Sequence, residues 1–367
     1  MRIGVNALYL IPGGVGGTEI YLRRLLEAME RIPGHEIVVF TNRETGRLGG
    51  HTVELPVRAV SRPQRILYEQ FKFPAEVRRH GIDVLLNPGF TAPLLCGVPQ
   101  VTVFHDLQHK RHPEFFRWFD LPFWRFLLWA SAHRSRRLVA VSEATRDDLL
   151  KYYRLDPDRI SVVHHGVEPE FFELAARRED GGYLLCASTT HPHKNHDRLL
   201  RAFQRLAKER PGLKLVLTGV KGFVTGEVEG LVRALGLEAF VELKGWVPRA
   251  ELYELFRRAT GFIYPSRFEG FGMPVLEAMA AGVPVACGAI EPLRTLTGGA
   301  ALLFDPESDE AILDAMRRLV RGEAPTDGPL RAAPFTWQRA AEQTLAAIED
   351  SLRGGSSRRS SSRGTSR

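Results

Sequence analysis

The chain alternates between short apolar runs and longer helical patterns along most of its length. In the first half, strand-like runs lie at 2–7, 35–41, 83–86, 101–105 and 138–142, with helical segments from residue 18 and through 62–80. The second half repeats the theme, with runs at 183–187, 214–219, 240–245 and 261–264 and helical segments at 197–208, 229–235 and 248–259. Such alternation is typical of parallel strands joined by crossover helices. The sequence therefore predicts an α/β protein with two doubly wound, Rossmann-like sheets.

The length of 367 residues also favours two domains, because a single core stops growing at about 250–300 residues. The block at 166–172 and the charged segment at 177–182 separate the two alternating halves. We expect one domain at 1–175, a second at 176–336, a final amphipathic helix at 337–353 and a polar tail at 354–367.

The net charge of +7 is concentrated at one end of the chain. The tail carries four arginines and no acid, so the remainder has a charge of 7 − 4 = +3. This nearly balanced body has no recognition motif, which argues against a nucleic-acid-binding protein. The tail has no apolar residue to bury and is expected to be disordered, with a weak contact to anionic lipid as the alternative.

Compartment signals favour the cytoplasm. The N-terminus predicts a strand and lacks the apolar core of a secretory signal, and no apolar run approaches the ~20 residues of a membrane span. The three cysteines have no disulfide-like or metal-like spacing. A hydrophobic content of 44% with 25% charged residues fits a globular enzyme.

The segment at 266–285 combines two carboxylates with several glycines and prolines, which interrupt regular secondary structure. Glycines and Pro274 end the strand at 261–264 and predict a loop that carries Glu269. Pro274 suits a helix start and Gly282 the residue after a helix end, so we expect a helix at 275–281 with Glu277 near its start. The amides at such a helix start can accept a phosphate, and a carboxylate one turn further can accept hydrogen bonds from ribose or sugar hydroxyls.

Three other loops follow predicted strands, where ligands gather in open α/β sheets. The glycine-rich loop at 11–18 can approach a phosphate or sugar, although its spacing is not that of a dinucleotide fingerprint and a tight turn is an equal interpretation. His105 ends the strand at 101–104 and could form a hydrogen bond to a ligand or be a core histidine. Lys194 lies at a helix start, where an ammonium could neutralise an anion or simply face solvent. The neighbouring histidines have no cysteine with them, so we do not expect a zinc site.

The segment at 268–285, with Glu269 and Glu277 in a Glu-x7-Glu pattern, resembles the signature of the retaining glycosyltransferases of family 4. Segments at 139–149, 166–172, 193–195 and 246–252 resemble the other blocks of that family, in the same order. The resemblance covers roughly the first 350 residues. It implies the GT-B fold, in which two Rossmann-like domains face an interdomain cleft and the last helix crosses back to the first domain.

The resemblance also implies roles. The domain at 1–175 would bind the acceptor, and the domain at 176–336 would bind a nucleotide-diphosphate sugar. His105 and Glu269 would be catalytic: His105 would contact a hydroxyl of the transferred sugar or of the acceptor, and Glu269 would hold the donor sugar. Glu277 would bind the ribose, and Lys194 would neutralise the diphosphate, so no metal or other cofactor is expected. The full donor-binding set would be Gly16, Gly17, Ser188, Lys194, Phe271, Gly272, Met273 and Glu277. Related enzymes often have arginine at the position of His193.

Two stretches combine aromatic and basic residues, which an interfacial surface needs. The stretch at 115–137 holds three of the five tryptophans, and the stretch at 62–79 interleaves aromatic residues with arginines and lysine. Either could instead be a helix whose aromatic face packs inward. If these stretches form an interfacial surface, the protein should contact the inner face of the membrane.

The leading hypothesis is a retaining transfer of a hexose, with mannose as one option, to a glycan or lipid-linked acceptor in cell-envelope polysaccharide or glycolipid synthesis. Alternatives are a transferase with a soluble small-molecule acceptor and a non-catalytic nucleotide-sugar-binding protein. A nicotinamide-dependent dehydrogenase is disfavoured, because the first strand lacks the Rossmann glycine spacing.

Overall fold

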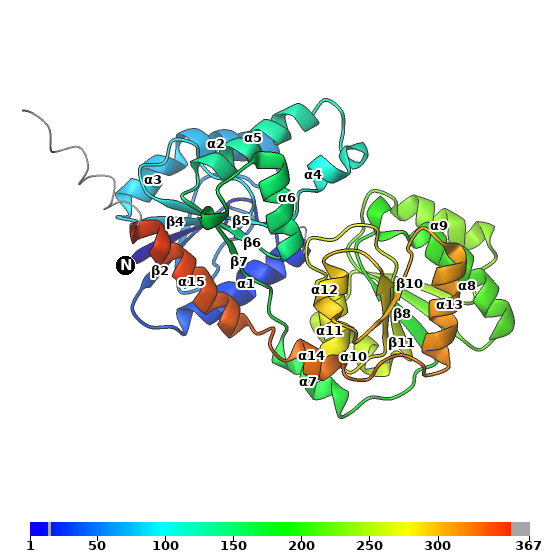
Figure 1. Cartoon of the computed structure of the whole chain (residues 1–367). Helices are drawn as coiled ribbons and strands as arrows, with labels where there is room; N and C mark the ends of the chain where they lie inside the picture. The colour runs from blue at the N-terminus through cyan, green and yellow to red at the C-terminus, as the bar shows by residue number, and fades with distance from the viewer. Residues whose placement is uncertain (14–15, 354–367) are drawn as a thin grey trace, which may run out of the picture. The chain divides into compact units, whose positions relative to one another are not determined.

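The computed structural model describes residues 1–13 and 16–353, so the expected tail at 354–367 and Gly14 of the glycine-rich loop lie outside the described residues. The chain forms two compact units (Figure 1). Unit 1 contains residues 1–165 together with the helix that begins at Trp337, and unit 2 contains Gly166–Thr336. The prediction of an α/β protein with two parallel sheets is confirmed.

Unit 1 is built on a parallel sheet of seven strands in the order β3-β2-β1-β4-β5-β6-β7. The chain starts at β1, winds outward to β3, and then restarts beside β1 at β4, so the sheet has its topological switch between β1 and β4. The strands are β1 (Arg2–Asn6), β2 (Glu36–Thr41), β3 (His51–Glu54), β4 (Val84–Asn87), β5 (Gln100–Phe104), β6 (Arg137–Ala140) and β7 (Ile160–Val162). Strands β3 and β7 are sheet edges that the sequence analysis did not predict.

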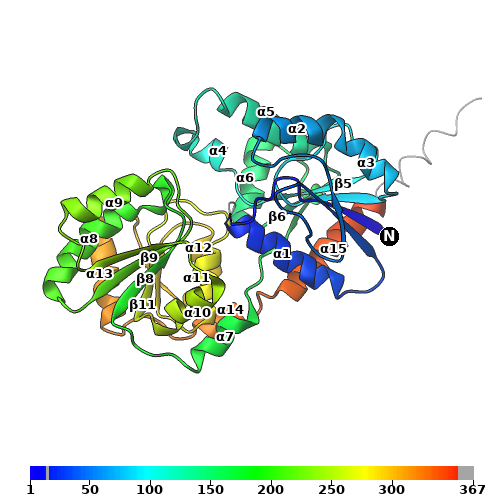
Figure 2. The same cartoon turned by 180° about the vertical axis from the view of Figure 1, so that it is seen from behind.

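Helices cover both faces of this sheet (Figures 1 and 2). They are α1 (Gly17–Glu30), α2 (Arg62–Phe71), α3 (Phe73–Arg79), α4 (Gln108–Arg111), α5 (Leu121–Arg134), α6 (Glu143–Tyr153) and α15 (Trp337–Arg353). Helix α15 packs against α1 and against the central strands β4, β5 and β6. A second layer, formed by α5 and α6, encloses an apolar cluster around Phe104, Leu138 and Leu149.

One predicted helix is divided in the structure. The segment expected as a single helix at 62–80 forms α2 and α3, with Lys72 between them. Pro74 explains the division, because a proline has no backbone N–H to donate and its ring clashes with the carbonyl four residues earlier. Pro74 instead occupies the first turn of α3, where the missing N–H has no consequence.

Unit 2 is built on a parallel sheet of six strands in the order β10-β9-β8-β11-β12-β13, with its topological switch between β8 and β11. The strands are β8 (Tyr183–Ala187), β9 (Lys214–Thr218), β10 (Val241–Gly245), β11 (Gly261–Tyr264), β12 (Val285–Gly288) and β13 (Leu302–Phe304). The helices are α7 (Pro169–Ala175), α8 (His196–Glu209), α9 (Thr225–Ala234), α10 (Arg249–Arg258), α11 (Met273–Ala280), α12 (Leu293–Thr297), α13 (Asp309–Val320) and α14 (Gly328–Ala332). Helices α8 and α13 pack together, as do α7, α10 and α11.

Unit 2 begins at Gly166, before the domain boundary expected near residue 175. The reason is that 166–175 makes its contacts within unit 2. The Val167 amide donates to the Phe335 carbonyl at 3.0 Å, and Glu168 is bonded to Arg249 and Tyr253 of α10. The segment at 177–182 is therefore an internal loop of unit 2.

Candidate functional site

The switch point of unit 2 brings together the loops that follow β8 and β11. Because the chain leaves the two strands in opposite directions, these loops diverge and leave a crevice at the carboxyl edge of the sheet, where open α/β proteins bind ligands. The loop after β8 carries Ser188 and Lys194, and the loop after β11 carries Glu269. Three residues proposed from sequence therefore lie on the two loops that flank this point.

Asn195 holds the loop after β8 in place. Its backbone adopts the left-handed conformation (φ 63°), which asparagine tolerates better than most residues, and it caps the start of α8. Its side-chain amide donates to the carbonyls of Pro265 and Pro306 at 3.0 and 2.7 Å. The Arg267 amide also donates to the His193 carbonyl, at 2.8 Å. The loops after β8, β11 and β13 are thus joined by hydrogen bonds through buried groups.

This arrangement places Lys194 beside Glu269. The Lys194 ammonium donates to Glu269 Oε1 at 2.7 Å and to the Tyr264 hydroxyl at 2.9 Å. Only 14% of the lysine side chain and 9% of the glutamate side chain are exposed. Such a desolvated ion pair is stronger than a surface pair, so the ammonium has a fixed position at the crevice. The alternative interpretation of Lys194 as a solvent-facing lysine is contradicted.

Glu277 belongs to a second buried ion-pair network. Its Oε1 accepts a hydrogen bond from Arg249 at 2.9 Å, and the same guanidinium contacts Glu168 Oε2 at 2.5–2.7 Å. The Tyr253 hydroxyl donates to that Glu168 oxygen at 2.6 Å. The Arg249 guanidinium also lies over the ring of Phe171, 5.0 Å from its centroid. Helices α7, α10 and α11 therefore meet around one arginine.

Two carboxylates share this single cation, which perturbs both partners. Burial raises the pKa of Glu277, and the nearby Glu168 adds to that effect, while Arg249 opposes it. Burial alone would lower the pKa of Arg249, but Glu277 and Glu168 raise it overall. Arg249 is therefore the group that opposes the effect of burial on the pKa of Glu277.

The start of α11 shows why a glycine is needed between the two glutamates. Gly272 caps this helix with φ 107°, and a Cβ there would overlap the Leu293 side chain. Phe271 is buried and its ring lies 6.2 Å from that of Phe335, whereas Met273 is half-buried. The predicted donor-binding residues 271–273 thus form the turn that leads from Glu269 into the helix of Glu277.

Further polar and aromatic contacts surround the loop after β8. The Ser188 hydroxyl lies 3.0 Å from His196 Nε2, and burial lowers the pKa of His196 to about 4. His191 and His193 stack at 5.6 Å between ring centroids. Within residues 1–13 and 16–353, no three His, Cys, Asp or Glu side chains are grouped as metal ligands.

In unit 1, His105 follows β5 and is buried. Its Nε2 lies 2.9 Å from the Pro88 carbonyl, so Nε2 carries the proton and Nδ1 is left as an acceptor. Burial lowers the pKa of His105 to about 4, so the imidazole is neutral at physiological pH. Its ring packs against those of Tyr21 and Phe90, at 4.8 and 5.1 Å between centroids. The interpretation as a core histidine is confirmed for Nε2, which is bonded to backbone, and a hydrogen bond from a ligand to Nδ1 stays a prediction.

Gly16 and Gly17 lie at the start of α1. Gly16 is the residue before the helix, with φ 59°, and Gly17 is its first residue. A Cβ on either would meet no atom within 4 Å among the described residues. As far as residues 1–13 and 16–353 are concerned, the space beside this helix start is open, as close approach of a ligand would require.

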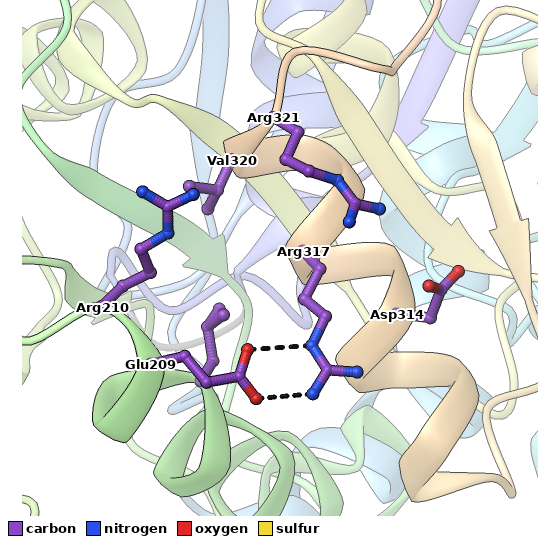
Figure 3. A pocket seen from close by; sticks show the side chains of 7 residues that line it. Glu209, Arg210, Asp314, Arg317, Val320 and Arg321 are labelled. Carbon is purple, nitrogen blue, oxygen red and sulfur yellow. Dashed lines mark hydrogen bonds and ion pairs between the residues drawn. The ribbon is translucent and has the colours of Figure 1, made fainter.

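A separate pocket lies between the C-terminal ends of α8 and α13 (Figure 3). It has a volume of about 410 Å³ and includes a two-point ion pair between Arg317 and Glu209, at 3.0 and 2.5 Å. Its lining residues are Leu206, Glu209, Arg210, Asp314, Arg317, Val320 and Arg321. Because α8 runs back from the loop of Lys194, its C-terminal end lies at the opposite edge of the sheet. This pocket is not part of the candidate site.

Sequence reasoning missed Glu168, Arg249 and Tyr264. The first two lie in blocks that it singled out, at 166–172 and 246–252, but it interpreted these blocks only as family likeness and as a linker. Tyr264 is the last residue of β11, so its position at the carboxyl edge of a strand was the available signal.

Comparison with known proteins defines the class. A family model described as Glycosyltransferase Family 4 matches residues 15–171, and one described as Glycosyl transferases group 1 matches residues 167–333. The sucrose-phosphate synthase of Thermosynechococcus elongatus has a similar fold, with a TM-score of 0.80, 19% identity and coverage of 96% of this chain and 100% of that one. The Anabaena protein HepE in complex with UDP-glucose gives a TM-score of 0.71 at 18% identity, with coverage of 95% and 100%. The predicted GT-B fold is confirmed.

Curated relatives are similar over most of the chain. The O-antigen chain mannosyltransferase B of Escherichia coli is 29% identical over 269 residues, which is 68% of this chain and 70% of that protein. The MMP alpha-(1->4)-mannosyltransferase of Mycolicibacterium hassiacum is 30% identical over 301 residues, which is 75% of this chain and 72% of that protein. The chain therefore belongs to the GT-B glycosyltransferases that combine a family 4 domain with a group 1 domain, and it is a glycosyltransferase.

Proposed function

We propose that the protein is a retaining hexosyltransferase of family 4 that moves a sugar from a nucleoside diphosphate to a hydroxyl of a glycan or lipid-linked acceptor, in envelope polysaccharide or glycolipid synthesis. Mannose is the proposed sugar, because relatives named as O-antigen and MMP mannosyltransferases match most of the chain. Unit 2 would hold the donor, and unit 1 the acceptor.

The contact between Lys194 and Glu269 is the observation that carries this proposal. It puts a cation and a carboxylate 2.7 Å apart at the crevice between β8 and β11. The ammonium can donate a further hydrogen bond to a diphosphate oxygen and stabilise the negative charge that develops as the nucleotide leaves. Glu269 would face the sugar side of the bond between sugar and diphosphate, where it would accept hydrogen bonds from the sugar hydroxyls. The amides of Phe271 and Gly272 and the side chain of Met273 would complete this contact.

The ribose would bind at Glu277, one turn into α11. Arg249 donates to that carboxylate and opposes the rise of its pKa on burial, which favours the form that accepts hydrogen bonds from ribose hydroxyls. We propose that neither a metal nor another cofactor takes part, because Lys194 supplies the positive charge for the leaving diphosphate. Added chelator should then leave turnover unchanged. His105 Nδ1 would accept a hydrogen bond from a hydroxyl of the sugar or of the acceptor. Gly16 and Gly17 would let a ligand approach the start of α1.

A ligand screen tests the donor half of the proposal. Thermal shifts should be largest with one nucleoside diphosphate and its sugar conjugate, because a true ligand stabilises by mass action. Glu269→Gln should keep nucleoside diphosphate affinity within a few-fold and lower kcat by about 100–1,000-fold. The exposed Glu251→Gln is the matched control, with little change expected. Product NMR should show the anomeric configuration of the donor. Equal turnover for Glu269→Gln and wild type, or an inverted product, would refute the assignment.

The proposed acceptor side includes a membrane-facing surface on unit 1. Six aromatic residues on α2, on α5 and on the segment between α4 and α5 have exposed fractions of 43–83%. They are Phe71, Trp118, Phe119, Phe123, Phe126 and Trp129, and we call them the aromatic face. Helices α2 and α5 lie side by side (Figures 1 and 2), with the Arg62 guanidinium over the Trp124 ring at 5.4 Å. For these six residues, the interpretation that they pack inward is contradicted.

Charge complementarity selects anionic lipid as the partner of the aromatic face. The exposed cations Arg62, Lys72, Arg117 and Arg134 lie on the same helices and connecting segment. Aromatic rings at headgroup depth with cations around them are typical of proteins that lie on a membrane surface. No helix of residues 1–13 and 16–353 has the length and apolar character of a membrane span. We propose a cytoplasmic enzyme that contacts the inner face of the membrane.

Vesicle sedimentation tests the membrane contact. Wild type should sediment with phosphatidylglycerol vesicles at low salt and be released by high salt, because surface electrostatics are screened. The combined substitution Phe71→Ser, Trp118→Ser and Phe126→Ser should weaken binding about tenfold or more. Leu330→Ser, which changes a side chain of unit 2 that is 79% exposed, is the control and should bind like wild type. Wild-type protein that stays in the supernatant would favour a soluble small-molecule acceptor.

Binding of the donor without any turnover would favour a non-catalytic binding protein.

A further inference from the structure

A buried polar cluster lies at the switch point of the sheet of unit 1. Strands β1 and β4 end there, and the loops that follow them carry Tyr9 and Thr91. Helix α2 contributes Arg65 and Glu69 to this cluster. Because the chain leaves β1 and β4 in opposite directions, this edge is the expected position of a ligand crevice in an open α/β sheet.

Glu69 is satisfied without Arg65. Its side chain is 1% exposed, and Oε1 accepts from the Asn6 amide at 2.8 Å and from the Thr91 hydroxyl at 2.9 Å. The Thr91 hydroxyl also lies 3.1 Å from Oε2. The carboxylate is therefore a structural acceptor that ties α2 to the ends of β1 and β4.

Arg65, in contrast, is buried without a full set of partners. The residue is 8% exposed, and its one ion pair within residues 1–13 and 16–353 joins Nη1 to Glu69 Oε2 at 3.8 Å. That distance is too long for a hydrogen bond. A guanidinium has five N–H donors, and buried arginines normally pair them with carboxylate, carbonyl or phosphate oxygens. Within the described residues, no group accepts a hydrogen bond from the Arg65 guanidinium, and burial lowers the pKa of Arg65.

Tyr9 supplies a second unused donor close to Arg65. Its hydroxyl oxygen is buried and has no hydrogen-bond partner in the described part of the chain. Burial raises the pKa of Tyr9. The Gly89 carbonyl, beside the Tyr9 ring, accepts from the Thr91 amide at 2.9 Å. Because the Thr91 hydroxyl is bonded to Glu69, the partner of Arg65, these contacts connect Tyr9 to Arg65. The ring of Tyr9 lies so close to Gly89 that a Cβ there would overlap it. The packing therefore leaves the ring no freedom on that side.

The backbone next to these residues is strained. Phe90 has φ 70°, a conformation that bulky residues rarely adopt and that persists mainly at functional sites. The strained residue packs against His105, at 5.1 Å between ring centroids. The unused donors thus belong to the same set of loops as the imidazole that we expect to contact the acceptor.

We propose that Arg65 and Tyr9 form a binding site for an anionic group of the acceptor, a phosphate monoester or diester. The guanidinium would donate two parallel hydrogen bonds to the phosphate oxygens, and the Tyr9 hydroxyl would donate a third. A neutral glycan would leave the cation uncompensated. This inference rests on the proposed function, since it assigns the charge of the acceptor of that reaction.

Binding measurements with simple phosphates test the site in the full-length protein. Glycerol 3-phosphate is the soluble probe, and dihexanoyl phosphatidic acid is the lipid probe. Both should bind wild type, and the tighter of the two identifies a soluble or a lipid source of the phosphate. Arg65→Met should weaken binding about tenfold or more, and Tyr9→Phe, which keeps the ring, should weaken it severalfold. Arg47→Met, which changes an exposed arginine in the loop between β2 and β3, should bind like wild type.

Nucleoside diphosphate binding separates this site from the donor site. It should be unchanged in Arg65→Met and Tyr9→Phe, because those residues would contact only the acceptor. Equal phosphate affinity in wild type and Tyr9→Phe, or no phosphate binding by wild type, would overturn the proposal. So would a loss of nucleoside diphosphate affinity in Arg65→Met, which would assign the cation to the donor. Phosphate binding that depends on Arg65 in a protein that binds no nucleoside diphosphate would instead uphold the site and refute the proposed function.

Discussion

Replacing Arg249 by methionine should destabilise unit 2 in a manner that depends on pH. The substitution keeps an apolar stem over the Phe171 ring but removes the guanidinium that contacts Glu168 and Glu277. Those two carboxylates are 4% and 9% exposed, so water cannot replace the lost cation without rearrangement. Two like charges then remain buried close together.

The expected cost is large at neutral pH. Removing one partner of a buried ion pair costs about 3–5 kcal/mol, because it leaves a charge without compensation. For a unit of about 170 residues, each kcal/mol shifts the melting temperature by about 2–4 °C, so the loss should be about 6–20 °C. Arg258→Met is the matched control on the same helix. Arg258 is 53% exposed and lies 3.8 Å from Glu179, so its loss should change stability by about 0.5 kcal/mol or less.

The sign of the pH dependence follows from Glu277. Burial and Glu168 raise its pKa, and the variant lacks the arginine that lowers it. A carboxyl whose pKa is higher in the folded than in the unfolded state favours folding at low pH, and that contribution is lost as pH rises through the folded pKa. The deficit of Arg249→Met relative to wild type should therefore be complete at pH 8 and fall by at least half at pH 5.

Calorimetric melting of both proteins at pH 5, 6.5 and 8 measures this deficit. Adding Glu168→Gln to Arg249→Met should recover part of the stability at pH 8, because one of the two buried charges is gone. A deficit below about 1 kcal/mol, or one of equal size at pH 5 and pH 8, would refute the idea that Arg249 compensates two buried carboxylates.

Three further predictions concern other parts of the molecule. Lys194→Met should lower kcat by about 100-fold or more in a donor transfer assay, and similar turnover to wild type would remove the lysine from the leaving-group site. Burial lowers the pKa of His105 to about 4, so the neutral ring stabilises the fold fully above pH 6.5 and loses about 3 kcal/mol towards pH 4. His105→Gln should abolish that part of the acid sensitivity in melting curves, and parallel curves for the two proteins would contradict it. Gly272→Ala should destabilise unit 2 by about 2 kcal/mol or more in denaturant titrations, because the residue has φ 107° and a Cβ would overlap Leu293. The control Gly226→Ala, in a helix with open space around the site, should be neutral or slightly stabilising.

The positions of Lys194 and Glu269 on adjacent loops could be predicted from the sequence. Alternation of apolar runs identifies β8 and β11, and ligand loops follow the carboxyl ends of parallel strands. Their direct ion pair could not be predicted, because it depends on the turn at Asn195 and on its hydrogen bonds to carbonyls of two distant loops. Local pattern carries no information on such pairings.

The network around Arg249 was beyond sequence reasoning for a related reason. It needs three helices to meet at one side chain, and their mutual positions are set by packing rather than by local pattern. The aromatic face illustrates a second limit. Helix α5 is apolar around much of its circumference, so its sequence does not distinguish the side that packs against β5 from the side that faces solvent.

Helix α15 has a consequence for the order in which the protein is made. It covers β4, β5 and β6 of unit 1, yet the ribosome produces it after all of unit 2. At about 5–20 residues per second, the 353 − 165 = 188 residues that separate His165 from the end of α15 take roughly 10–40 s to synthesise. During that interval unit 2 can fold, whereas unit 1 has an uncovered apolar face. The half of the enzyme that is synthesised first is therefore completed last, and its need for chaperones should be greatest while translation is still under way.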